Sequence, residues 1–235
     1  MPRHDGRRGR SLRPVGIRKG YITSEANSIL FETGATRVIC AATLEERVPP
    51  FLRNTGKGWI TAEYGMLPRS SPQRIPRESV RGSVKGRTHE IQRLIGRSIR
   101  AGVDLEAIGE RTLIVDCDVL EADGGTRTAS INGGFMAAAG ALRSAGLKDA
   151  VKGFVAAVSV GMKGGRVLLD PDYLEDSTAD VDMNFVIDEN GMIIEVQGTA
   201  EGAPFSGKDL ERMLAAARAG VTELIALQKK GLRWR

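Results

Sequence analysis

The chain has 235 residues, of which 41% are hydrophobic and 27% charged, an ordinary composition for a globular protein that can bury a substantial core. No apolar run approaches the roughly 20 residues of a membrane-spanning helix, and the polar N-terminus does not resemble a secretory signal. The only cysteines, Cys40 and Cys117, lie in apolar runs, so we expect no disulfide framework and a cytoplasmic protein.

The net charge of +5 conceals a marked separation of charge along the chain. Residues 168–201 contain ten acidic side chains and no Lys or Arg, whereas residues 69–100 contain nine basic side chains and only two acidic ones. A basic surface attracts polyanions, and a carboxylate cluster can hold a metal ion or move a proton. Together the two segments indicate chemistry on phosphate esters.

The first part of the chain reads as a basic arm followed by strands. Residues 1–14 are rich in Arg and Gly and lack apolar periodicity, so we expect an arm that is either flexible or held on the surface. Strand-like runs, separated by turn residues, follow at 15–22, 27–33, 36–48 and 58–64. Residues 66–86 carry three prolines among several arginines, and a loop of this length is usually functional or disordered.

The middle of the chain alternates helix and strand. Apolar side chains at three- and four-residue steps predict a helix over 88–101, with Thr88 as its N-cap. A buried strand at 112–120 precedes an Ala-rich helix at 128–145. The two glycines at 133–134 disfavour a helix unless they allow close packing against a neighbouring backbone, which we therefore expect.

The last third returns to strands and ends in a helix. The expected strands span residues 153–162, 166–169, 179–187 and 191–198. The sequence Asp188-Glu189-Asn190-Gly191 predicts a hairpin turn, and an apolar stripe predicts a closing helix over 207–230. This order predicts an α/β or α+β domain with mixed sheets and packed helices, and the first and last thirds suggest two related halves.

Two predicted helix starts are candidate phosphate sites. Residues 123–130 lie between a strand and a helix, where glycines expose backbone amides and the helix N-terminus attracts an anion. Thr126 and Thr128 can cap that helix, and Arg127 adds a fork of donors suited to phosphate oxygens. Arg87 precedes the other helix. From spacing alone, a capped helix start with an incidental arginine explains residues 123–130 equally well, whereas for Arg87 the spacing favours an arginine on a solvated face.

Acidic side chains alternate along the strand expected near residue 180. Asp180, Asp182 and Asn184 share one strand face, and adjacent side chains on such a face are roughly 7 Å apart. Two carboxylates and an amide at this spacing can bind hydrated Mg²⁺ or place an acid near a leaving oxygen. The alternative is a solvent-facing edge strand whose charges prevent aggregation.

A second acidic pair offers a different chemistry. Asp116 and Asp118 are also two residues apart, and with Glu121 and Asp123 they could begin a two-metal nuclease site. The alternative is the polar face of a strand. With only two histidines in the chain, a histidine-based metal site or a catalytic triad is not expected.

Taken as a set, the motifs resemble the ribonuclease PH family of bacterial phosphorolytic exoribonucleases. The segments that carry this resemblance, in chain order, are residues 7–14, 68–74, 86–97, 121–128, 180–184 and 196–201. They include Glu121-Ala122-Asp123-Gly124-Gly125-Thr126-Arg127-Thr128 and Asp180-Val181-Asp182-Met183-Asn184. The resemblance extends over essentially the whole chain without a large departure.

The resemblance implies a fold like domain 2 of ribosomal protein S5, duplicated within one domain that spans residues 1–235. It implies a homohexamer, built as a trimer of dimers. It also implies that inorganic phosphate, as co-substrate, attacks the 3′-terminal phosphodiester of RNA and releases a nucleoside diphosphate, while the reverse reaction adds nucleotides. The implied substrates are 3′ ends of tRNA precursors, and Mg²⁺ is an expected cofactor.

The resemblance also implies residue roles. The residues expected to hold the attacking phosphate are Arg87, Gly125, Thr126 and Arg127. Asp176 and Asp182 match catalytic or metal-binding aspartates, with Asp180 nearby. The residues that match the loop gripping RNA are Arg69, Arg74 and Arg77. Two alternatives remain: a hydrolytic two-metal exoribonuclease, and a non-catalytic RNA-binding subunit of a ring.

Overall fold

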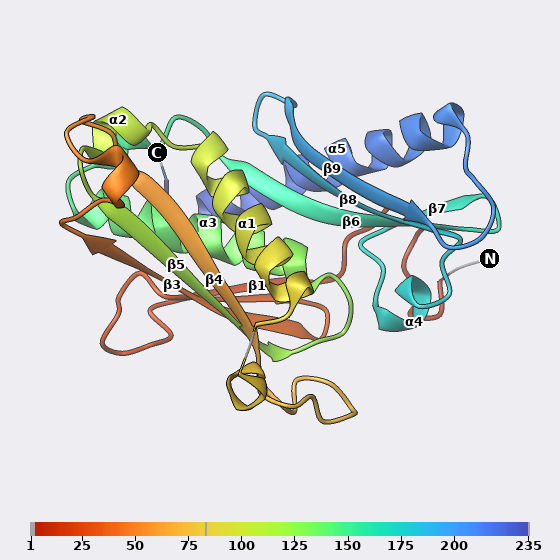
Figure 1. Cartoon of the computed structure of the whole chain (residues 1–235). Helices are drawn as coiled ribbons and strands as arrows, with labels where there is room; N and C mark the ends of the chain where they lie inside the picture. The colour runs from red at the N-terminus through yellow and green to blue at the C-terminus, as the bar shows by residue number, and fades with distance from the viewer. Residues whose placement is uncertain (1–2, 83, 235) are drawn as a thin grey trace.

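Each half of the chain forms one β-sheet in the computed structural model, which describes residues 3–82 and 84–234 (Figure 1). The first sheet contains β1 (Val15–Lys19), β2 (Ile29–Thr33), β3 (Thr36–Glu45), β4 (Trp59–Met66) and β5 (Thr112–Glu121). The second contains β6 (Val155–Lys163), β7 (Arg166–Leu169), β8 (Val181–Asp188) and β9 (Ile193–Ala200). The strand orders are β1-β2-β3-β5-β4 and β7-β6-β8-β9, and β4 runs parallel to β5 whereas the other neighbours are antiparallel.

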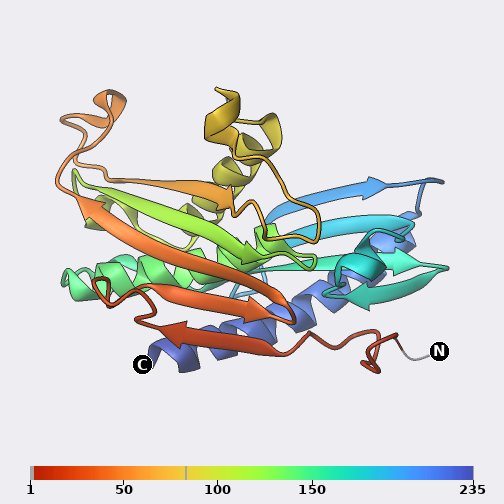
Figure 2. The same cartoon turned by 90° about the horizontal axis from the view of Figure 1, so that it is seen from below.

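Helices fill the space between and beside the two sheets. The helices are α1 (Gly86–Ala101), α2 (Leu105–Ile108), α3 (Thr126–Ser144), α4 (Tyr173–Asp176) and α5 (Gly207–Leu232), with short 3₁₀ turns at Pro50–Leu52, Glu78–Arg81 and Lys148–Ala150. Helix α3 packs against β3 and β5 of the first sheet and against β6 of the second, so it is buried on nearly every side (Figures 1 and 2). Its small side chains permit this close approach.

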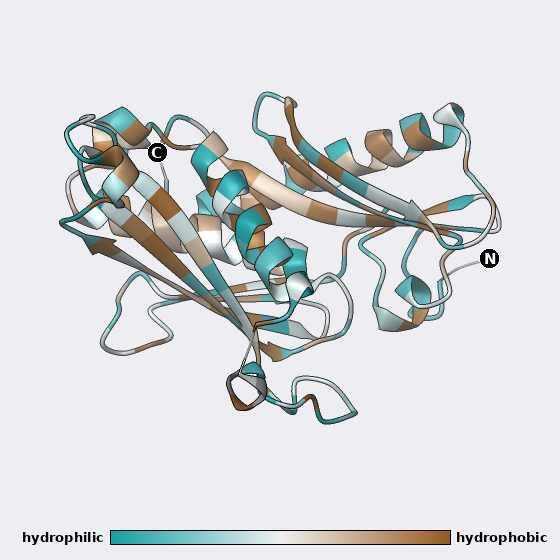
Figure 3. Ribbon diagram, viewed as in Figure 1, coloured by the Kyte–Doolittle hydropathy of each residue, from teal (hydrophilic) through white to brown (hydrophobic). Residues whose placement is uncertain are grey.

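The outer helices are amphipathic. Helix α1 packs on β4 and turns its hydrophilic side to the viewer in Figure 3, whereas α5 packs along β6 and β7. The buried apolar side chains of both halves form a single cluster. Within residues 3–82 and 84–234, no helix is both long enough and apolar enough to cross a bilayer.

The predicted strands and long helices are confirmed, with ends shifted by a few residues. The N-cap of α1 is Lys85 rather than the predicted Thr88, which lies inside the first turn and donates a hydrogen bond to Glu78 Oε1 at 2.7 Å. The expected backbone neighbour of the helical glycines is wrong as well. A Cβ on Gly133 would lie 2.8 Å from Cys40 Sγ, so the glycine makes room for side chains of the first sheet.

Buried ion pairs hold the N-terminal arm on the surface. Arg3 donates through Nε to Glu175 Oε1 at 2.7 Å, and Arg13 donates through Nη2 to Asp170 Oδ1 at 2.7 Å. Both arginine residues are less than a tenth exposed. These two arginines are therefore structural and fix the arm against the segment that leads into α4.

Candidate active site

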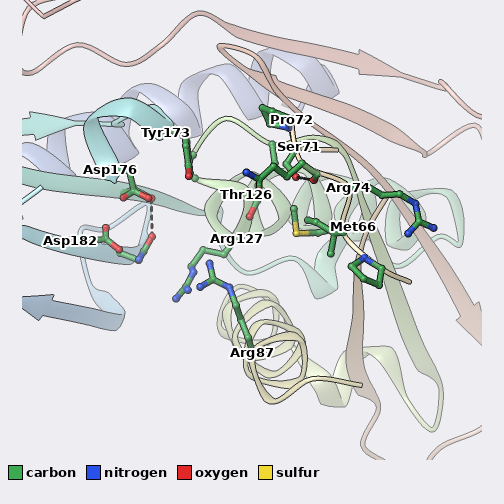
Figure 4. A pocket seen from close by; sticks show the side chains of 18 residues that line it. Met66, Ser71, Pro72, Arg74, Arg87, Thr126, Arg127, Tyr173, Asp176 and Asp182 are labelled. Carbon is green, nitrogen blue, oxygen red and sulfur yellow. Dashed lines mark hydrogen bonds between the residues drawn. The ribbon is translucent and has the colours of Figure 1, made fainter. Parts of the chain in front are cut away.

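A cavity of about 660 Å³ lies between the two halves of the chain (Figure 4). The first half lines it with Met66, residues 71–76, Arg87, Ala122 and residues 124–127. The second half contributes Ser159, Tyr173, Asp176, Asp182 and Asn184. Both sequence-predicted phosphate-binding arginines and two of the predicted aspartates therefore reach the same cavity, although 95 residues separate Arg87 from Asp182.

Both arginines stand at the beginning of a helix. Arg87 is the second residue of α1, and Arg127 is the second residue of α3. The first amides of a helix have no intrahelical acceptor and carry a partial positive charge. In Figure 4 the two guanidinium groups lie close together, with Asp176 and Asp182 to one side. This arrangement concentrates positive charge at one end of the cavity.

Hydrogen bonds to its carbonyl groups fix the loop before α3. Thr36 Oγ1 donates to the Gly124 carbonyl at 2.7 Å, and Arg13 Nη1 donates to the Asp123 carbonyl. Gly124 and Gly125 have backbone φ angles of 75° and 66°, which residues with a side chain rarely adopt. The first amides of α3 have no intrahelical acceptor, so they can bind an anion.

The carboxylates come from two separate elements of the second half. Asp176 ends the short helix α4, whose start is fixed by an Asp172–Glu175 capping box, and Asp182 is the second residue of β8. Burial, together with the neighbouring Asp176 carboxylate, raises the pKa of Asp182 to about 6, against the opposing charge of Arg127. Burial also raises the pKa of Asp176, against the opposing charges of Arg127 and Arg87.

These charged groups have few partners of their own. Among residues 3–82 and 84–234, the side chains of Arg87, Asp176 and Asp182 form no hydrogen bond or ion pair, although Arg87 and Arg127 are near enough to shift both aspartate pKa values. Arg127 donates one hydrogen bond, from Nη1 to Gln197 Oε1 at 2.8 Å. Opposite charges thus face each other across the cavity without neutralising each other.

Not every predicted site residue lines the cavity. Asp180 precedes β8, is exposed, and accepts a hydrogen bond from the Gly164 amide at 2.7 Å. Arg74 lines the cavity from the loop, whereas Arg69 and Arg77 are exposed residues outside the lining. Strand alternation grouped Asp180 with Asp182, but the strand begins only at Val181, so the alternation does not extend back to Asp180.

Two side-chain contacts at the cavity carried no signal in the sequence. Tyr64 Oη lies 3.0 Å from Thr126 Oγ1, and Ser159 Oγ donates to Asn184 Oδ1 at 2.8 Å. Thr126, predicted as a cap, is instead the first residue of α3, which follows Gly125 without a side-chain cap. Only the folding of β4 and β6 against α3 and β8 brings these partners together, so spacing in the sequence could not reveal them.

The acidic residues of the alternative two-metal site do not converge. Asp116 and Asp118 lie along β5 outside the cavity, and burial raises the pKa of Asp116. Glu121 pairs with Arg37, and Asp123 accepts a hydrogen bond from the Tyr173 amide. One metal-sized cluster exists in the described part of the chain, made by His4, Asp172 and Glu175, but Arg3 and Arg7 already neutralise its Glu175.

Comparison with known proteins identifies the family. Domain 1 of the 3′ exoribonuclease family matches residues 11–147, and domain 2 of the same family matches residues 153–220. The chain belongs to the 3′ exoribonuclease family. Members named Ribonuclease PH align over almost its full length. The Moorella thermoacetica protein is 56% identical (99% of this chain, 95% of the relative), and the Corynebacterium kroppenstedtii protein is 54% identical (98% and 92%).

Solved structures share this fold. An Archaeoglobus fulgidus exosome structure with RNA bound to its active site superposes with a TM-score of 0.79 at 22% identity, covering 95% of this chain and 91% of the other. Rice (Oryza sativa) Rrp46 superposes with a TM-score of 0.78 at 19% identity, covering 98% of this chain and all of the other. At these identities the likeness establishes the fold, and the predicted S5-like α/β class is confirmed.

The relatives at 53–56% identity confirm the predicted activity. The protein is a phosphorolytic 3′–5′ exoribonuclease of the 3′ exoribonuclease family, a phosphate-dependent tRNA nucleotidyltransferase that uses inorganic phosphate as co-substrate and RNA as substrate. Neither alternative, the hydrolytic two-metal nuclease or the non-catalytic ring subunit, is favoured.

Proposed function

We propose that the cavity between the two halves is the phosphorolytic site, with inorganic phosphate bound at its positive end. Arg87, Arg127 and the Gly125-Thr126 amides would hold the phosphate. The observation that carries the proposal is the meeting of two arginine-bearing helix starts in one cavity, opposite two carboxylates that have no partner in the described ranges. Such donors suit a small dianion.

The arrangement suits attack by phosphate on the terminal phosphodiester. A phosphate oxygen forms a bond to phosphorus while the bond to the 3′ oxygen of the preceding nucleotide breaks, which releases a nucleoside diphosphate. The nucleophile is already anionic, so no strong base is needed. The attacking phosphate and the terminal phosphodiester are both negatively charged and repel each other as they approach. The arginines and the helix amides offset this Coulomb cost.

Asp182 is the residue we propose to assist departure of the 3′ oxygen. Its pKa of about 6 leaves part of the population protonated near neutral pH, so the carboxyl group can donate a proton to the leaving oxygen. Asp176 lies beside it and helps to keep that pKa raised. We assign the partner role to Asp176 and not to Asp180, because Asp180 is exposed and bonded elsewhere.

The same two carboxylates fit Mg²⁺. Their oxygens are hard ligands without hydrogen-bond partners among the described residues, and Mg²⁺ commonly binds one or two carboxylates together with water and substrate phosphate. Asp176 and Asp182 would hold the ion, which when bound would stabilise negative charge on the leaving oxygen. Without the ion, Asp182 stays protonated up to a higher pH than an ordinary aspartate does.

We propose that the basic loop guides RNA and that six chains assemble. Arg69, Arg74 and Arg77 are exposed, and Arg74 reaches the cavity, so they can contact the RNA backbone without reading bases.

The edge strand β9 exposes Ile193 and Val196, which suits burial against another copy. We propose a homohexamer, built as a trimer of dimers, that works on tRNA precursors in the cytoplasm. Light scattering should give six times the 25.3 kDa chain mass.

One incubation tests the proposed reaction. The protein is given an RNA with a 3′ tail, with and without inorganic phosphate, and the released mononucleotide is identified. We expect nucleoside diphosphates that appear only with phosphate. Nucleoside monophosphates released without phosphate would refute phosphorolysis, and an inactive Arg87→Ala/Arg127→Ala double variant serves as the negative control.

A further inference from the structure

A polar network behind Arg127 connects the second sheet to helix α1. At its centre, Gln197 on β9 makes three side-chain hydrogen bonds. Its Oε1 accepts from Arg127 Nη1 at 2.8 Å, and its Nε2 donates to Glu90 Oε1 and to Glu195 Oε1, each at 3.0 Å. Arg97 of α1 completes the network through Glu195 Oε2 at 2.7 Å.

The partners fix the orientation of the Gln197 amide. A guanidinium group can only donate hydrogen bonds, and ionised carboxylates can only accept them. The carbonyl oxygen must therefore face Arg127, and the amino group must face Glu90 and Glu195. A carboxylate, a hydroxyl or an apolar side chain at this position could not satisfy all three neighbours.

The amide also separates two groups of opposite charge. Glu90 Oε1 lies 3.7 Å from Arg127 Nη1, within ion-pair range but beyond hydrogen-bond distance. Gln197 is bonded to both of these atoms, and so occupies the interaction that they would otherwise make with each other. A movement of about 1 Å would let Glu90 pair directly with Arg127, and a charge-assisted bond of that kind would compete with phosphate.

We propose that Gln197 is a positioning residue that keeps Arg127 available to phosphate. This inference rests on the phosphate-binding role proposed for Arg127. A neutral amide occupies Nη1, while Nε and Nη2 of Arg127 form no hydrogen bond within residues 3–82 and 84–234. Because Arg127 lines the cavity and its side chain is 19% exposed, these donors can reach a bound anion.

A Gln197→Met variant tests the role, because methionine keeps the length of the side chain and removes the amide. Initial rates of phosphorolysis are measured over a range of phosphate concentrations with a 3′-tailed RNA. We expect the KM for phosphate to rise about tenfold, which corresponds to the loss of one charge-assisted contact. We expect kcat at saturating phosphate to change less than about threefold. Gln92→Met, at a glutamine on α1 outside the cavity lining, is the matched control and should leave both constants unchanged.

A second substitution separates positioning from simple structural support. In the Gln197→Met background, Glu90→Gln removes the charge that would otherwise pair with Arg127, so we expect the KM for phosphate to return most of the way to its original value. If Gln197→Met acted only by disturbing the local structure, the further substitution Glu90→Gln would not restore the KM. A KM that stays unchanged in Gln197→Met, or a double variant that is no better than Gln197→Met, would overturn the inference.

Arg127→Ala, measured beside these variants, distinguishes the two levels of the argument. If Arg127→Ala raises the KM for phosphate and Gln197→Met does not, the inference fails while the proposed phosphate site stands. If Arg127→Ala leaves the KM unchanged, the proposed site fails and the inference fails with it.

Discussion

The N-terminal arm and the cavity use arginine and aspartate in opposite ways. In the arm, Arg13 and Asp170 are both nearly fully buried and bonded to each other. In the cavity, Arg127 and Arg87 approach Asp182 closely enough to influence its charge but make no bond to it. The same residue types therefore stabilise the fold in one region and remain available for ligands in the other.

The pKa values of Asp170 and Asp182 shift in opposite directions, which reflects this difference. Burial alone would raise the pKa of Asp170, but hydrogen bonds and charge from Arg13 outweigh it and hold that pKa below its ordinary value. For Asp182 burial and the Asp176 carboxylate prevail, and the pKa rises to about 6. A bonded partner stabilises the ionised form of a buried acid, whereas an arginine held at a distance does not compensate for lost solvation. Variants of each region can test this contrast.

The largest expected effect is on catalysis. Asp182→Asn keeps the shape of the side chain but can neither donate the proton nor supply a carboxylate ligand, so we expect kcat to fall about 10²- to 10⁴-fold while RNA still binds. Single-turnover rates and RNA binding by filter retention measure the two properties. Asp180→Asn is the matched control, since Asp180 lies outside the cavity. Equal damage from both substitutions would show that the assignment within the acidic segment is wrong.

The next effect is on stability, in the arm. Arg13→Met leaves Asp170 buried without its partner, so we expect the free energy of unfolding at pH 7 to fall by about 3–5 kcal/mol. The native pKa of Asp170 is lowered, so its contribution is complete above the pKa of the unfolded chain and is lost as pH falls through the native value. Urea unfolding should therefore show the difference from the parent protein shrinking below about pH 4.

An exposed arginine provides the control for Arg13. Arg18 pairs with Glu32 at 3.4 Å, and its side chain is 58% exposed. Arg18→Met should cost less than about 1 kcal/mol, because solvent screens the pair. Similar losses for Arg13 and Arg18 would contradict the structural role of the buried pair.

A smaller change is expected at the phosphate end of the cavity. Arg87→Ala and Arg127→Ala each remove a charged donor, which corresponds to a rise of about 10- to 100-fold in the KM for phosphate. RNA binding should largely persist, because the exposed arginines of the loop remain. Arg93→Ala, on the exposed face of α1, should leave the KM unchanged. Normal phosphate dependence in both cavity variants would refute their role.

Asp182→Asn should also stabilise the protein when phosphate and metal are absent. The native pKa is raised, so the protein loses stability as pH rises from the ordinary value of 3.8 through about 6. Asparagine does not ionise, and the variant should exceed the parent by up to about 3 kcal/mol at pH 8, with no difference below about pH 4. Urea unfolding at pH 4, 6 and 8, in the presence of a chelator, measures this difference in the free energy of unfolding. A variant less stable at pH 8 would show that Asp182 stabilises the fold.

The smallest effect concerns the loop. Replacing Arg69, Arg74 and Arg77 by alanine should weaken RNA binding and reduce the slope of log affinity against log salt by about 0.7 for each lost phosphate contact. The KM for phosphate should rise little in comparison with the Arg127 variant. An unchanged salt slope would mean that the RNA follows a different path.

Periodicity was sufficient for most of the fold. Helix α1 and helix α5 carry apolar stripes that only a 3.6-residue repeat explains, and β8 alternates apolar and polar residues from Val181 to Phe185. Helices α2 and α4 were missed, because four residues are too few to show a period. Nothing near Asp170 and Asp172 in the sequence reveals that Arg13 and His4 would become their partners.

The sequence by itself determined the strands and the long helices, the basic and acidic segments, and the motifs that identify the family. Only the tertiary structure decided which arginines pair and which stay available, because partners such as Arg13 and Asp170 are more than 150 residues apart. It also decided that Asp176 and Asp182 share a cavity while Asp180 does not. Charge can be counted from a sequence, but solvation and contact, which set its energy, exist only after the chain has folded.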